Sequence, residues 1–122
     1  MASRDTVPDD LSTPCEATFT RLALYEPTRL RDWILHGVLK DVDLSFALEA
    51  FGFVRNRTMA VALLTPFLRH EKCYVREGAL LGLSRHLGPD LRDPLLEVAQ
   101  RDILDAICEH ARELVDLIDS KR

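Results

Sequence analysis

The sequence predicts an all-α protein of about seven helices that pack as stacked helical hairpins. Apolar residues recur at the three- and four-residue spacing of amphipathic helices, and no segment shows the strict alternation of a strand. A repeat of about 32 residues runs through most of the chain. The 122 residues, 47% apolar and 30% charged, are typical of a single globular domain with its own core.

Capping residues and prolines set the expected helices of the N-terminal half. Residues 1–12 are polar and are expected to form a flexible arm outside the domain of residues 13–122. The run Thr13-Pro14-Cys15-Glu16 is typical of a helix start, because threonine caps, proline fits the first position and glutamate completes a capping box. Pro27 should end this helix, and Thr28 should cap the next. The polar run 40–43 then separates two helices, so the expected helices are 13–25, 28–39 and 44–54.

The C-terminal half shows similar signals. Asn56 or Thr58 can cap a long helix, and Pro66 inside it should kink it because proline removes one backbone donor. Gly88, followed by Pro89, should end the next helix in a left-handed conformation. The expected helices lie at residues 57–70, 75–87, 93–99 (capped by Asp90 or Asp93) and 102–119.

The second to seventh helices form three pairs that repeat with a period close to 32 residues. Shifting the sequence by this period places Val75 on Ile107, and Ala79 on both Ala47 and Ala111. Small residues that recur on one face are expected where adjacent helices approach closely. A period of 20–50 residues with two helices per unit indicates a solenoid. The expected units are approximately residues 28–55, 57–87 and 90–119.

One unit carries a more specific motif. The segment 64–83 contains Val75-Arg76-Glu77-Gly78-Ala79, and the segment 95–115 follows the same order with Cys108 in place of the arginine. The chain resembles the HEAT-repeat, armadillo-like α-solenoids, whose hallmark is a polar turn followed by Val-Arg-x-x-Ala-x-x-x-Leu. The first unit of this chain, residues 28–55, is degraded and lacks the Val-Arg pair. The resemblance implies a short right-handed α-solenoid of three HEAT-like hairpins plus an N-terminal half-repeat. It also implies that Arg76 reaches Asp102, or a neighbouring carbonyl, in a ladder between units.

Charge and composition narrow the classes of function. The net charge is −4 over residues 1–54, +4 over 55–86 and −4 over 87–122. This pattern suits a charged protein partner, whereas duplex nucleic acid needs a sustained basic surface. No stretch approaches the ~20 apolar residues of a membrane span, and the N-terminus lacks a signal pattern. Three widely spaced cysteines fit reduced thiols, so a cytoplasmic location without membrane contact is expected.

The sequence predicts no catalytic, cofactor-binding or metal-binding residues. No CxxC or HExxH spacing occurs. The HEAT-like deoxyhypusine hydroxylases hold two irons with repeated His-Glu pairs, but here His70-Glu71 ends a first helix and Glu109-His110 has the reverse order. Cys73 lies beside Lys72 near His70, and this pairing is expected to be a chance one rather than a nucleophile with its base.

The remaining candidate site is a surface. In such solenoids the second helix of each unit lines the concave face. The helix 102–119 carries six acidic residues, which suggests an acidic docking surface; the alternatives are an ordinary solvated face and the basic segment 55–85. Leu81 is the expected apolar anchor. The predicted partner-binding residues are Glu49, Glu77, Leu81, Ser84, Arg85, Glu109, Arg112, Glu113 and Asp116.

The first functional hypothesis is therefore a non-catalytic protein-binding module, such as an adaptor, an assembly factor or an immunity-type inhibitor of a basic toxin domain. The second is a degenerate HEAT-like enzyme or cofactor-handling protein, of the lyase or metal hydroxylase type. The third is nucleic-acid binding through the basic middle segment. The expected partner is another protein, with a homodimer through one end of the solenoid as a further option.

Overall fold

The computed structural model describes residues 12–121, with side chains from Ala17 onward. Helices fill most of this part of the chain and no strand occurs in it, which confirms the all-α prediction. The expected flexible arm and the capping side chains at Thr13 and Glu16 lie outside the described residues and side chains. The elements are α1 (Ser12–Tyr25), α2 (Pro27–Leu35), α3 (Asp41–Phe51), α4 (Arg57–Leu64), the 3₁₀ helix η1 (Thr65–Arg69), α5 (Cys73–Leu83), the 3₁₀ helix η2 (Pro89–Leu91), α6 (Arg92–Arg101) and α7 (Asp105–Ser120).

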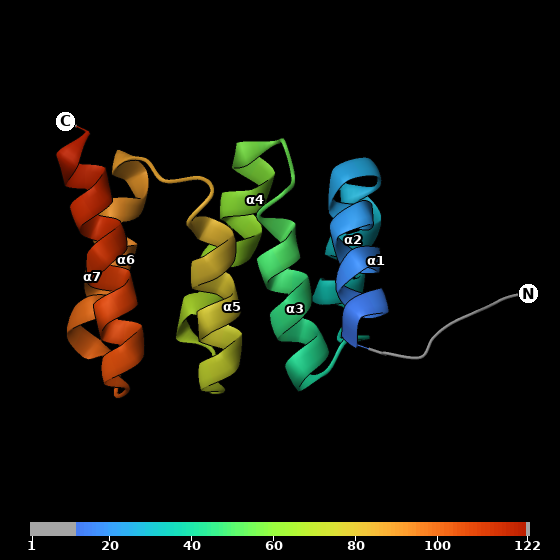
Figure 1. The fold of residues 1–122 in the computed structure, drawn as a ribbon, viewed down its shortest axis with the longest axis horizontal. Helices are drawn as coiled ribbons and strands as arrows, with labels where there is room; N and C mark the ends of the chain where they lie inside the picture. The colour runs from blue at the N-terminus through green and yellow to red at the C-terminus, as the bar shows by residue number, and fades with distance from the viewer. Residues whose placement is uncertain (1–11, 122) are drawn as a thin grey trace, which may run out of the picture.

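The helices form two layers (Figure 1). α1, α3, α5 and α7 lie side by side in one layer, and α2, α4 and α6 lie behind them. Contacts join neighbours within the first layer, from α1 to α3, α3 to α5 and α5 to α7. The pairs α1–α2, α4–α5 and α6–α7 pack across the layers, so the apolar core lies between them.

The second helices of the three pairs occupy equivalent places. α3, α5 and α7 begin 32 residues apart. Ala47, Ala79 and Ala111, which the period aligns, are each 0% exposed, and so are Leu48 and Leu80. The period read from the sequence therefore corresponds to equivalent buried positions in successive helices.

Two glycines of α5 allow it to lie very close to α3. A Cβ atom at Gly78 would lie 2.5 Å from the carbonyl oxygen of Ser45, and one at Gly82 would lie 2.6 Å from that of Leu48. Real Cβ atoms do not approach a carbonyl oxygen so closely, so any larger residue would push the two helices apart. The Ser45 hydroxyl adds a hydrogen bond across the same interface, to the Tyr74 carbonyl at 2.8 Å.

The second and third helices differ from their expected bounds. α2 begins with Pro27 at its first position, so Thr28 lies inside the helix rather than at its cap. It ends at Leu35 instead of continuing to residue 39, because Gly37 adopts a left-handed φ of +71°. Most of the polar run 40–43 belongs to α3, which begins at Asp41 rather than at residue 44. Asp41 and Asp43 suit this position, because acidic side chains are favourable at the positive N-terminal end of a helix.

The fifth and sixth helices also differ from their expected bounds and caps. α5 starts at Cys73 and ends at Leu83, and Gly88 is extended with a φ of −171° rather than left-handed. Arg57 explains this end, because its guanidinium donates hydrogen bonds of 3.0 and 2.7 Å to the His86 carbonyl and so holds the segment after α5. Asp90 does not cap α6, since its carboxylate accepts two hydrogen bonds from Arg57.

The fourth helix shows the predicted effect of Pro66. The α-helix ends at Leu64 and the chain continues as η1, a tighter 3₁₀ segment that starts with Thr65 and Pro66. Asn56 caps α4, because its side chain accepts a hydrogen bond from the Met59 amide at 3.1 Å. Within the described residues no helix is both long enough and apolar enough to cross a membrane.

Candidate functional site

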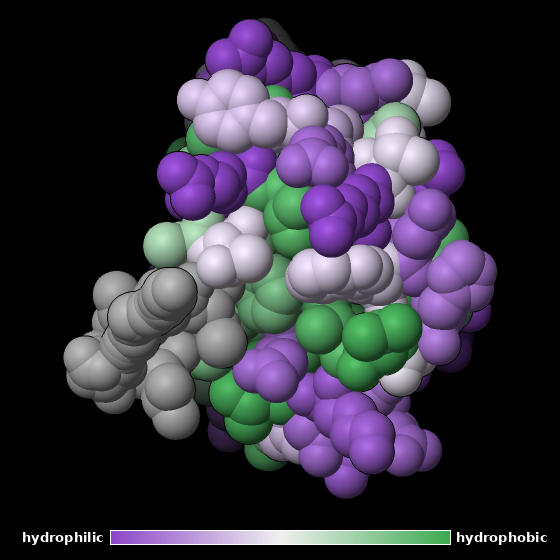
Figure 2. Space-filling view, turned by 90° about the vertical axis from the view of Figure 1, so that its right-hand side faces the viewer, coloured by the Kyte–Doolittle hydropathy of each residue, from purple (hydrophilic) through white to green (hydrophobic). Residues whose placement is uncertain are grey.

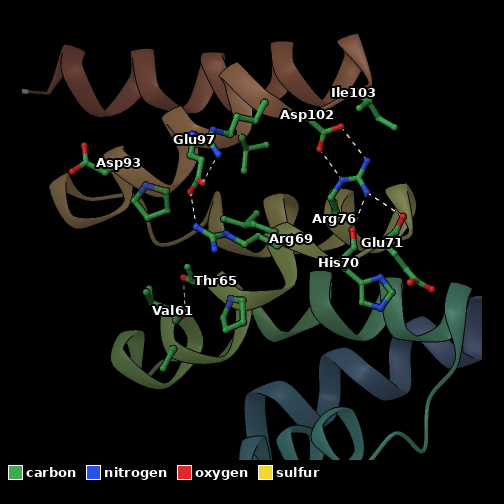
Figure 3. Close-up of a pocket in the computed structure, with 16 residues that line it drawn as sticks. Val61, Thr65, Arg69, His70, Glu71, Arg76, Asp93, Glu97, Asp102 and Ile103 are labelled. Carbon is green, nitrogen blue, oxygen red and sulfur yellow. Dashed lines mark hydrogen bonds and ion pairs between the residues drawn. The ribbon is translucent and has the colours of Figure 1, made fainter.

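One candidate site is a groove of about 1110 Å³ between α4–η1 on one side and α6 on the other (Figure 3). It lies in the layer of first helices, opposite the second-helix face that the sequence singled out. Val61, Leu68 and Val98 line it with apolar side chains, and Pro66 and Pro94 add apolar rings from the two walls. We refer to this site as the α4–α6 groove.

The groove exists because the third pair of helices packs less closely than the second. α5 contacts α7 much less extensively than it contacts α3. One period after Gly78 and Gly82, the α7 sequence has His110 and Leu114. The His110 side chain faces α5, as the 3.5 Å contact between its Nδ1 and Glu77 Oε2 shows, and Leu114 is buried one turn further along α7. They hold α7, and α6 with it, away from α5, which leaves space between α4–η1 and α6.

A buried ion pair closes one end of the groove. Arg76 donates from Nε to Asp102 Oδ2 at 2.7 Å and from Nη2 to Oδ1 at 3.0 Å. The two side chains are only 11% and 4% exposed. Arg76 Nη1 also donates to the carbonyls of His70 and Glu71, at 2.8 and 3.3 Å. The structure thus forms the contact expected between Arg76 and Asp102, and that contact ties the turn before α5 to the turn before α7.

Asp102 is charged in this arrangement. Burial raises its pKa, but hydrogen bonds from the Arg76 guanidinium and from the Leu104 amide outweigh burial and hold the pKa below its usual value. The paired carboxylate is a fixed structural charge and not a proton donor at neutral pH. It positions the chain where Ile103, 87% exposed, projects at the end of the groove.

A second group of charges crosses the middle of the groove. Arg69 from η1 donates to Glu97 of α6 at 2.8 Å, and Arg101 lies 3.9 Å from the other oxygen of the same carboxylate. The arginine side chains are 77% and 79% exposed. One carboxylate therefore serves two guanidinium groups on opposite walls, and both arginines remain open to solvent.

The residues predicted to bind a partner do not form one continuous exposed surface. Glu109, Arg112, Glu113 and Asp116 are exposed on α7, and none of the four forms an ion pair with another described residue. Most of the predicted residues on α3 and α5 are less accessible. Glu77 faces His110, and Leu81 is half-buried rather than the exposed anchor expected of it.

The other predicted residues on α3 and α5 are partly engaged. The Ser84 hydroxyl donates to the Leu81 carbonyl at 2.6 Å. The Arg85 guanidinium lies 3.9 Å from the centre of the Phe53 ring, in a cation–π contact. Glu49 is half-buried. Arg85 is nevertheless exposed, so it and the α7 residues are the accessible part of the predicted surface.

Histidines and cysteines take part in local contacts. The His70 Nδ1 atom accepts a hydrogen bond from the Lys72 amide at 3.0 Å, and its ring stacks on Phe67. Cys108, which replaces the motif arginine in the third unit, donates from Sγ to the Asp102 carbonyl at 3.1 Å. Cys73 is exposed at the start of α5. No group of three or more histidine, cysteine, aspartate or glutamate side chains gathers as a metal site in the described part of the chain.

The N-terminal end of the stack carries exposed apolar side chains. Figure 2 views the molecule from the side of α1 and α2, and hydrophobic atoms (green) lie between polar ones on this face. Tyr25 at the end of α1 is 75% exposed, and Leu35 at the end of α2 is 58% exposed.

Sequence reasoning missed the α4–α6 groove, although two signals for it are present. Pro66 breaks the first helix of the second unit, and His110 and Leu114 replace two glycines one period later. Aligning bulky residues with small ones across the period would have indicated a looser contact between α5 and α7.

Comparisons with known proteins do not assign the site or the chain. The chain matches no model of a protein family, no curated protein and no solved structure.

Proposed function

We propose that the chain is a non-catalytic protein-binding module, built as a short HEAT-like α-solenoid of three hairpins and an N-terminal half-repeat. The equal spacing of α3, α5 and α7 and the equivalent burial of Ala47, Ala79 and Ala111 support this architecture. The Arg76–Asp102 pair supports it too, because it links neighbouring units as the ladder of such repeats does. Adaptors, assembly factors and immunity-type inhibitors all fall within this class.

The observation that carries the proposal is the α4–α6 groove. It is open, about 1110 Å³ in volume, lined by apolar side chains at its centre and edged by charged ones. The polar pair at its end, Arg76–Asp102, is committed to structural contacts, and the arginines at its middle are open to a partner. Leu68 and Val98 form a buried floor, 4% and 8% exposed. A partner segment would cover the half-buried Val61 and the exposed ring of Pro66, and such apolar burial is the main source of binding free energy at interfaces.

A second surface of the same function is the exposed side of α7. Asp105, Glu109, Glu113 and Asp116 recur at helical spacing on that side, with Arg112 among them. Their charges are not neutralised by ion pairs within the described residues, so they suit a basic partner. The two surfaces make different predictions for mutants and can be separated.

Affinity capture with mass spectrometry tests the proposal. The bait is the full chain, and the lysate comes from the cells that naturally make the protein. Ala62 is exposed and lines the groove, so Ala62→Trp should fill the groove without disturbing the core. Ala106→Trp is the matched control on exposed α7 surface, and Glu109→Lys/Glu113→Lys/Asp116→Lys reverses the acidic side of α7.

We expect wild type to retain a stoichiometric partner that Ala62→Trp loses and Ala106→Trp keeps. If only the triple lysine variant loses the partner, the binding site lies on α7 and not in the groove. The binding function would be wrong if no protein is retained stoichiometrically, or if purified protein holds stoichiometric iron or zinc, as a HEAT-like hydroxylase would. Steeply salt-dependent binding to nucleic acid would instead favour the basic segment 55–85.

A further inference from the structure

We propose that the occupant of the α4–α6 groove is a short amphipathic helix of another protein, with one acidic side chain that lies between Arg69 and Arg101. This inference rests on the proposed function, since it names the kind of segment that the binding module takes. The shape of the groove, its apolar lining and its charges each contribute to it.

The groove has the dimensions of a short helix. An α-helix with its side chains is about 10 Å wide, so a volume of about 1110 Å³ holds about 14 Å of helix, or about nine residues at a 1.5 Å rise. α6, which forms one wall, has ten residues and is therefore of similar length. A helix in this place would pack on α4–η1 and α6 at once and would continue the layer of first helices (Figures 1 and 3).

The walls favour a helix over an extended segment. Both walls are helical, so most of their backbone groups are already used in bonds within the helices. An extended peptide would find no strand edge to pair with and would leave its own backbone groups unpaired. A helix satisfies its backbone internally and needs only side-chain contacts.

The lining requires an apolar stripe on that helix. Val61 and Pro66 offer accessible apolar surface from α4–η1, and Pro94 offers it from α6. Ile103 stands 87% exposed at one end, where an apolar residue of the occupant would cover it. Apolar residues at positions i, i+3 or i+4 and i+7 of the occupant would meet these side chains.

The charges specify an acidic residue on the occupant. Arg69 and Arg101 stand on opposite walls and share the single carboxylate of Glu97, which leaves one positive charge uncompensated. Guanidinium groups bind carboxylates in a planar, bidentate manner, so a second carboxylate between the two arginines would complete the group. Asp93 and Glu71 lie toward the two ends of the groove, and neither forms an ion pair with another described residue, which disfavours an occupant that is acidic throughout (Figure 3).

Selection from a displayed library of helical peptides about 14 residues long, with the purified full chain as target, tests the inference. We expect enrichment of peptides with the i, i+3 or i+4, i+7 apolar stripe and one fixed Asp or Glu. The selected peptides should bind Ala62→Trp and Arg69→Ala/Arg101→Ala about tenfold or more weakly than wild type. Ala106→Trp and Arg112→Ala are the matched controls and should bind them as wild type does.

Glu97→Gln gives a result in the opposite direction. It removes the carboxylate that competes for the two arginines, so the selected acidic peptides should bind about threefold more tightly. A peptide variant with the acidic residue changed to its amide should lose this gain. Retained folding of each chain variant is checked by its thermal unfolding.

Three results of this selection would overturn the inference. They are enrichment of peptides without an acidic residue, binding that is indifferent to Ala62→Trp, and the absence of any helical binder. None of them would refute the proposed function, which is tested separately by the capture of a protein partner and by metal analysis. A natural partner that is lost with the α7 lysine variant and not with Ala62→Trp would overturn the inference while leaving the function standing.

Discussion

Among the ion pairs of the described residues, Arg76–Asp102 has the largest expected effect on stability. Its side chains are 11% and 4% exposed, whereas the side chains of the Arg57–Asp90 pair are 41% and 54% exposed. Exposed pairs contribute little, but removing one member of a buried pair leaves an uncompensated charge. The resemblance to HEAT repeats implied this contact, with a neighbouring carbonyl as the alternative partner of Arg76. It could not predict the burial of the pair, which depends on the turns before α5 and α7.

Asp102→Asn should therefore lower the free energy of unfolding by about 3 kcal/mol, because Arg76 keeps its charge and loses its partner. Urea unfolding followed by circular dichroism measures the change. Asp116→Asn is the matched control on α7, where the carboxylate is exposed, and should change the free energy by less than about 0.5 kcal/mol. Equal effects of the two substitutions would mean that the buried pair contributes no more than a surface charge.

The same pair predicts a dependence of stability on pH. The pKa of Asp102 is lower in the folded protein than in the unfolded chain, so its stabilising effect is present above the unfolded pKa of about 3.9 and is lost as the pH falls through the folded value. The stability difference between wild type and Asp102→Asn should be constant near neutral pH and should shrink below about pH 4. A difference that grows on acidification would contradict the assignment.

At the scale of elements, the sequence predicted the existence of every helix better than its ends. Amphipathic spacing and caps indicate a helix locally, and Asn56 and Pro66 acted as expected. The ends of α2 and α5 depend on Gly37 with its positive φ and on the hydrogen bonds from Arg57 to the His86 carbonyl. The contact of Arg57 with the His86 carbonyl is a tertiary one, which a local sequence pattern cannot predict.

The contact between α3 and α5 makes a prediction at this scale. Gly78→Ala would improve the helix propensity of α5 by about 1 kcal/mol, but its Cβ would lie 2.5 Å from the Ser45 carbonyl oxygen. The clash should outweigh the propensity and destabilise the protein by about 2 kcal/mol in thermal or urea unfolding. His110→Ala, one period later in the looser contact of α7, is the comparison and should cost less. A stabilised Gly78→Ala protein would show that the helices can separate freely.

At the scale of the whole molecule, the two-layer stack follows from the repeat, and the groove follows from a departure from it. Equivalent positions recur every 32 residues, yet α5 packs on α3 through glycines and on α7 through His110 and Leu114. The acidic side of α7 could be predicted because it depends on one helix alone. The α4–α6 groove depends on how closely successive pairs of helices pack, so helix-by-helix reasoning did not find it.

Hydrogen exchange on the complex with the partner that wild type retains tests the central claim most directly, because it reports which helices the partner covers. The account predicts slower exchange in residues 57–69 and 92–101, which form α4–η1 and α6, with little change on α7. Protection confined to residues 105–120, with α4–η1 and α6 unchanged, would contradict it.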